Sequence, residues 1–286
     1  HGVVKCALGW ACWKTYVGRP ETDKFRQSAM QVLGAGLSEA GRHEDVLAVD
    51  EARFEMLRRH GESGQVMLSV MGNLASTYGT LGRDEEALQM NRDVHSGWLR
   101  LGGEDNDNTL RAAVNYTSNL VTQEGFDEAK ALLGKTIPVA RRVLGEGHML
   151  TLTMRFNYTK VLCRDANSTL DDRREAVTTL EEIERIARRV FGGAHPFTAD
   201  IERDLLGART IVARNLYINP AATLDDLREA VTTLEEAERT ARRKLGGAHP
   251  TTGVIEESLR DARVALGFRC EEELCEMVAA MTPGGA

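Results

Sequence analysis

The chain has 286 residues, of which 42% are hydrophobic, 28% charged and 5% aromatic, and its formal net charge is −7. These values exclude a disordered, collagen-like or disulfide-dense chain, and the acidic charge disfavours a bulk nucleic-acid binder. With six prolines and few aromatic residues, the core must consist of Leu, Ala, Val and Met, which suit helices better than sheets.

Cysteine content and hydropathy indicate the compartment. Five sparse cysteines in a long chain predict reduced thiols rather than a secreted disulfide framework. They are Cys6, Cys12, Cys163, Cys270 and Cys275. No apolar run approaches the roughly eighteen residues of a membrane-spanning helix. We therefore predict a cytoplasmic protein without membrane insertion.

Residues 1–20 form an apolar extension that precedes the regular part of the chain. Its predicted role is a helix packed against the first repeat, or a remnant of a preceding module. Cys6 and Cys12 lie near Trp10 and Trp13, so the end of a zinc module is an alternative. Their spacing is not the usual C-x₂-C of structural zinc sites, and we predict no metal and no cofactor.

From residue 24 onward, the sequence alternates between helical segments and turns. Residues 64–81 carry apolar side chains at spacings of three and four, which predicts one apolar helix face; they include Met67, Val70, Leu74, Tyr78 and Leu81. A break at residues 82–84 precedes a second helix that runs to about residue 101. The second helices begin with acidic residues and end with basic ones, as the helix dipole favours. Glycines then supply left-handed stops, namely Gly61, Gly145, Gly192 and Gly246.

These helix pairs belong to internal repeats. Residues 169–198 and 223–252 are identical at 24 of 30 positions, and weaker copies recur upstream at intervals of 42 residues. Because a lone helix pair cannot bury its apolar stripe, stacked pairs are expected. The prediction is an all-α solenoid of antiparallel helix pairs in one linear stack. The repeats occupy residues 21–267, as units of about 24–61, 62–103, 104–146, 147–193 and 194–247, followed by an acidic cap or tail at 268–286.

The last two repeats depart from the 42-residue period. The helix-to-helix turn of the fourth repeat, at residues 165–170, is longer than in the second and third repeats. The fifth repeat, which contains residues 219–222, is longer again. It is predicted either to extend its first helix or to carry a protruding loop.

Particular residues resemble a known repeat family. Asn73-Leu74-Ala75, followed by Tyr78 and Gly82, is similar to the first-helix pattern of tetratricopeptide repeats of the kinesin light chain type. The glycine-histidine junctions at 144–148, 191–196 and 245–250 are also similar to this type, and the resemblance covers about residues 24–267. It implies a right-handed superhelix whose concave groove is lined by first helices. The heptad coiled coil that joins light chains to the motor is absent from this sequence, so the resemblance does not imply a kinesin subunit.

The repeat register predicts which side chains face such a groove. Equivalent positions carry Asn73, Asn115 and Asn157, and an asparagine row suits an extended peptide because each amide both donates and accepts. Neighbouring groove positions hold Ser76, Ser118, Arg111, Lys160 and Arg164. The three cations would favour acidic side chains or a terminal carboxylate. The alternative is that the asparagines only hydrogen-bond between helices and space the repeats.

Other recurring residues have structural explanations. His148, His195 and His249 lie at successive junctions and are predicted to cap helices, since the period does not bring them together for metal binding. Paired arginines at the helix ends complement the helix dipole, or else form a stripe that meets phosphate or an acidic membrane surface. No phosphate-binding loop, H-E-x-x-H, G-x-S-x-G or dinucleotide motif occurs, so we predict no catalytic residue.

The sequence therefore predicts a non-catalytic interaction scaffold that binds an extended, acidic segment of a protein partner. It is expected to be a monomer or to self-associate weakly, and no nucleic-acid partner is expected. The competing prediction is a regulatory repeat arm of a larger protein, whose zinc-binding or catalytic domain lies upstream of residue 1. A purely structural array that self-associates is a third possibility.

Overall fold

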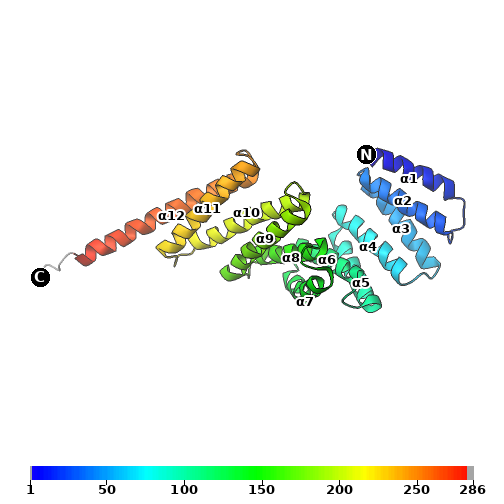
Figure 1. Cartoon of the computed structure of the whole chain (residues 1–286), viewed down its shortest axis with the longest axis horizontal. Coiled ribbons are helices and arrows are strands. Elements are labelled where there is room, and N and C mark those ends of the chain that lie inside the picture. Colours follow the sequence, from blue (N-terminus) through cyan, green and yellow to red (C-terminus); the bar gives the residue numbers. More distant parts are fainter. Residues whose placement is uncertain (1, 282–286) are drawn as a thin grey trace. The chain divides into compact units, whose positions relative to one another are not determined.

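The computed structural model describes the backbone of residues 2–281 and the side chains of residues 2–274. The described residues form helices joined by short turns and contain no strand (Figure 1), so the all-α prediction is confirmed. The helices are α1 (Gly2–Tyr16), α2 (Lys24–Glu39), α3 (His43–Arg59), α4 (Gln65–Thr80), α5 (Asp84–Gly102), α6 (Asp107–Thr122), α7 (Phe126–Leu144), α8 (Met149–Arg164), α9 (Leu170–Phe191), α10 (Pro196–Tyr217), α11 (Leu224–Lys244) and α12 (Pro250–Met281).

Local signals set the helix ends. Gly61, Gly145, Gly192 and Gly246 all have positive φ, between 68° and 90°, as predicted for left-handed stops. The Thr169 hydroxyl accepts a hydrogen bond from the Asp172 amide, and the Asp172 carboxylate accepts one from the Thr169 amide. This reciprocal capping box fixes the start of α9.

The predicted capping role of the junction histidines is confirmed. Nδ1 of His148, His195 and His249 accepts a hydrogen bond, in each case 3.2 Å long, from the backbone amide two residues later. At the preceding junction Asn106 caps the helix in the same way, since its side chain accepts a hydrogen bond of 2.8 Å from the Asn108 amide. The histidines therefore satisfy backbone donors that a helix start leaves without partners.

Residues 2–157 form one compact unit, within which α1 to α6 each pack against the next helix in the chain. Leucines fill its core, including Leu37, Leu57, Leu74, Leu120 and Leu133. The close packing of α1 on α2 depends on glycine, because a Cβ on Gly36 would lie 2.6 Å from the Lys5 carbonyl oxygen. The apolar extension is thus a helix seated on the first repeat.

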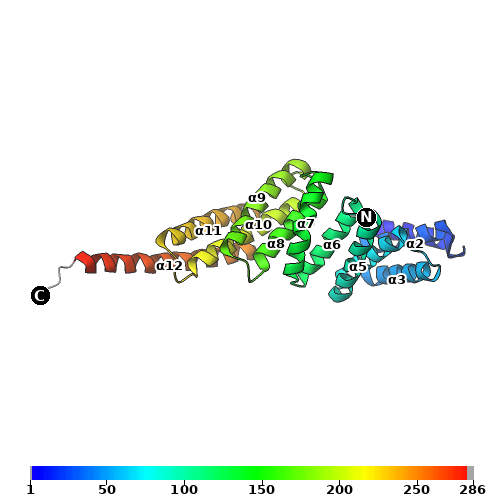
Figure 2. The ribbon, with the colours of Figure 1, turned by 90° about the horizontal axis from the view of Figure 1, so that it is seen from below.

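Residues 158–281 form a second compact unit, in which α10 packs against α9, α11 and α12. Both views show the C-terminal part of α12 extending beyond α10 and α11 (Figures 1 and 2). Leu180, Ile183, Ile201, Leu234 and Ala237 lie in its core. The boundary between the units falls within α8, inside the predicted fourth repeat.

The longer C-terminal repeats have longer helices. Helices α9 and α10 have 22 residues each, whereas α4 and α6 have 16. The fifth repeat thus extends its first helix, which was one of the two predicted outcomes. Helix α12 continues from Pro250 to Met281 without interruption, across the predicted border at residues 267 and 268 between the repeats and the acidic cap or tail. The side chain of Cys275 lies outside the described residues.

Candidate functional site

The repeat register places most of the predicted residues on one face of the first helices. Asn73 and Ser76 on α4 are exposed, as are Arg111, Asn115 and Ser118 on α6. Val70 and Leu74, which the sequence placed on the apolar face of residues 64–81, are buried. The period of the apolar residues therefore identified the exposed polar face correctly in α4 and α6.

Gln31, Asn73 and Asn115 form a row of exposed amides, which we call the amide row. They lie 42 residues apart on α2, α4 and α6. Among the described residues, the side-chain amides of Asn73 and Asn115 have no hydrogen-bond partner. Gln31 accepts a long hydrogen bond of 3.4 Å from Arg53. Gln31 was not among the predicted groove residues, although subtracting 42 from the number of Asn73 identifies it.

Asn157 does not continue this row. It was predicted to face the groove with Asn73 and Asn115, but the structure places it elsewhere. Its side chain is only 4% exposed, and its Nδ2 donates to Thr117 Oγ1 at 3.2 Å and to Ser118 Oγ at 3.0 Å. Asn157 therefore joins α8 to α6, which is the structural alternative for this position. The bond also engages the hydroxyl of Ser118, which was predicted to face a ligand.

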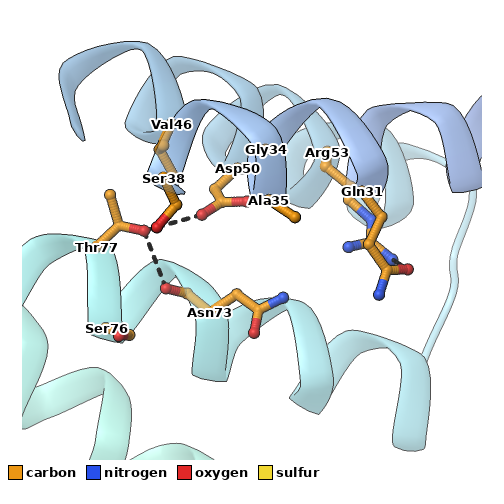
Figure 3. Close-up of a pocket in the computed structure, with 10 residues that line it drawn as sticks. All are labelled: Gln31, Gly34, Ala35, Ser38, Val46, Asp50, Arg53, Asn73, Ser76 and Thr77. Carbon is orange, nitrogen blue, oxygen red and sulfur yellow. Dashed lines mark hydrogen bonds between the residues drawn. The ribbon is translucent and has the colours of Figure 1, made fainter. Parts of the chain in front are cut away.

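A cleft of about 250 Å³ lies beside the amide row in the first two repeats. Figure 3 shows Gln31 and Arg53 on one side of it and Asn73 on the other. Helices α2, α3 and α4 supply its lining, which is Gln31, Gly34, Ala35, Ser38, Val46, Asp50, Arg53, Asn73, Ser76 and Thr77. The predicted groove consisted of first helices alone, so the contribution of α3 was not foreseen.

Asp50 and Arg53 give the cleft its electrostatic character. Asp50 is 7% exposed and accepts a hydrogen bond of 3.0 Å from the Thr77 hydroxyl, which also approaches the Asn73 carbonyl oxygen at 3.1 Å. Burial raises the pKa of Asp50, although Thr77 and Arg53 oppose the shift. Burial likewise lowers the pKa of Arg53, and its Nε is buried without a partner among the described residues. The cleft thus presents donors and an acceptor that are partly desolvated.

The predicted cations do not form one group. Arg111 is exposed and has no ion-pair partner among the described residues. Lys160 lies in the second unit and approaches Asp204 at 4.0 Å. Arg164 also lies in the second unit, so of the three cations only Arg111 shares a unit with the amide row. Arg53 on α3, the second helix of the first repeat, is another cation of that unit and lines the cleft beside the amide row.

Metal and membrane sites find no support in the described residues. Among the described side chains of residues 2–274, no three His, Cys, Asp or Glu residues gather in a way that would hold a metal ion. Cys6, Cys12, Cys163 and Cys270 are free thiols. No described helix is long and apolar enough to cross a membrane.

Comparison with known proteins identifies the repeat type. Residues 66–142 match the tetratricopeptide repeat family, and no curated protein matches the chain. The crystal structure of BtubC (BKLC) from P. vanneervenii is similar, with a TM-score of 0.61, 15% identity, and coverage of 86% of this chain and 93% of that one. A candidate kinesin light chain from Podosopora anserina, with nearly identical TPR-like repeats, gives a TM-score of 0.50 and 22% identity over 74% of this chain and 93% of its own. Residues 66–142 therefore match tetratricopeptide repeats, and the chain shares the fold of these solved structures of kinesin light chain-like repeats.

Proposed function

We propose that this protein is an interaction scaffold whose first unit binds an extended peptide along the amide row. Tetratricopeptide folds generally mediate protein–protein interaction and are typically non-catalytic. The observation that carries the proposal is that Asn73 and Asn115 expose amides without partners among the described residues, on the same face of successive first helices. Such amides match the alternating donors and acceptors of a peptide backbone.

The charges of the first unit favour an acidic segment. Arg111 lies on the amide-row face without an ion-pair partner among the described residues, and Arg53 lines the cleft beside Gln31 and Asn73. A guanidinium pairs well with carboxylates through parallel hydrogen bonds. Asp50 limits this preference, because its carboxylate lines the same cleft, where it accepts a hydrogen bond from the Thr77 hydroxyl. We also propose a cytoplasmic location, which the sparse free cysteines support.

A peptide array tests this proposal even though the natural partner is unidentified. The probe is an array of short random-sequence peptides, half of them enriched in Asp and Glu, and the strongest binders are then titrated in solution. We expect Asn73→Ala with Asn115→Ala to weaken binding about tenfold or more, because each lost hydrogen bond contributes roughly 0.5–1.5 kcal/mol. Arg111→Gln should weaken the binding of acidic peptides about twofold to fivefold, as expected for the loss of an exposed charge pair.

The matched control is Gln89→Ala, which removes an exposed amide from α5, outside the amide row. This variant should leave peptide affinity unchanged. Affinity within about twofold of wild type in the double variant, or the same loss in the Gln89 variant, would refute the amide row as the binding site. Equal affinity for neutral and acidic peptides would refute the charge preference alone.

A further inference from the structure

One buried threonine departs from the pattern of the repeat junctions. Thr151, Thr198 and Thr252 occupy equivalent positions near the start of a first helix, and each hydroxyl donates to a backbone carbonyl. The acceptors are Ala140 O at 3.3 Å, Gly192 O at 3.0 Å and Gly246 O at 2.9 Å. Thr109 lies 42 residues before Thr151 and is 2% exposed. Its Oγ1 is buried and has no hydrogen-bond partner among the described residues.

Thr109 lines a cleft of about 230 Å³ between α5, α6 and α7. Apolar side chains make up much of its wall, namely Leu99, Leu110, Leu132 and Val139. Glu104 and Lys135 also line the cleft and are exposed, so its edge carries no net charge. This cleft shares no lining residue with the cleft beside the amide row.

His95 places a second polar group in this cleft. Its ring stacks on Tyr116, with centroids 6.1 Å apart, and Arg92 Nε holds the Tyr116 hydroxyl through a bond of 2.7 Å. Burial lowers the pKa of His95, so the imidazole is neutral at neutral pH and offers one donor and one acceptor. Neither ring nitrogen has a hydrogen-bond partner among the described residues.

We propose that this cleft binds the phenol group of a ligand, with an apolar ring against the leucines and a hydroxyl between Thr109 and His95. A phenol hydroxyl accepts one hydrogen bond and donates another, which matches the Thr109 hydroxyl and a neutral imidazole nitrogen. The volume lies below the roughly 300–1,000 Å³ of drug-sized sites, so a single ring fits. The phenol group belongs either to a free small molecule or to a tyrosine of a partner.

The test is a methyl NMR titration of the full chain with p-cresol. We expect chemical-shift changes at the methyl groups of Leu99, Leu110, Leu132 and Val139. Toluene, which lacks the hydroxyl, should bind at least about tenfold more weakly, because it loses both hydrogen bonds and each contributes about threefold to tenfold. A parallel titration with N-acetyltyrosine amide distinguishes the sources, since tighter binding than p-cresol indicates a protein tyrosine, and weaker binding indicates a small molecule.

The matched variants are Thr109→Val and Thr198→Val, which remove an unpartnered and a bonded hydroxyl respectively. Thr109→Val should reduce the preference for p-cresol over toluene to the part that His95 contributes, while keeping its thermal stability. Thr198→Val should lower the melting temperature and keep the preference. The proposal is overturned if p-cresol shifts none of the cleft methyl groups up to its solubility limit, or if Thr109→Val binds p-cresol as tightly as wild type.

Discussion

Replacing Asn157 by alanine tests directly whether an asparagine of the repeat register is structural. The change removes two hydrogen bonds, to Thr117 Oγ1 and Ser118 Oγ, from a side chain that is 4% exposed. Both hydroxyls keep their own acceptor, the Val114 carbonyl, at 3.0 and 2.9 Å, so no buried donor is orphaned. Two bonds at roughly 0.5–1.5 kcal/mol each, with a small cavity in addition, predict a loss of about 1.5–3 kcal/mol.

The measurement is urea unfolding followed by circular dichroism, with Asn73→Ala as the matched control. Asn73 is exposed and its amide has no partner among the described residues, so its replacement should change stability by no more than about 0.5 kcal/mol. Both variants gain the same helix propensity from alanine, and the difference between them therefore reports the contacts of Asn157. Equal unfolding midpoints for the two variants would contradict the structural role.

Three further outcomes are expected. Asp50→Asn should raise the unfolding midpoint more at pH 7 than near pH 4. The pKa of Asp50 is raised in the native state, which therefore holds the proton more tightly, so wild-type stability falls as the pH rises from the unfolded pKa to the native one. Asn91 shows that an amide fits the corresponding site of the next repeat. An unchanged pH dependence of stability in the variant would contradict this role of Asp50. Burial raises the pKa of Cys163 to about 11, so peptide mapping should show it alkylated at least about tenfold more slowly at pH 8 than exposed Cys270, and equal rates would refute its burial. Leu133→Ala should cost about 2–5 kcal/mol of unfolding free energy, because Leu133 is 0% exposed; a loss below about 1 kcal/mol would show that α7 is packed differently.

The sequence determined the repeat class, the helix pairs and the exposed face of the first helices. These features depend on local periodicity and on backbone stops, and both are visible in a single chain. Thus Leu74 and Val70 were correctly assigned to the core, and Gly145 and Gly192 do adopt positive φ. The same register correctly placed Asn73 and Asn115 on the surface.

Only the tertiary structure decided which of these positions remain available to a ligand. Periodicity gives the direction of a side chain from its helix, whereas burial depends on the side chains that the neighbouring helix presents. Asn157 has the register of Asn73, yet its amide donates hydrogen bonds to the hydroxyls of Thr117 and Ser118. Thr109 likewise has the register of Thr151, but it has no carbonyl acceptor among the described residues and lines a cleft instead. Such differences between equivalent positions arise from contacts across repeats, which the periodicity of a single helix does not predict.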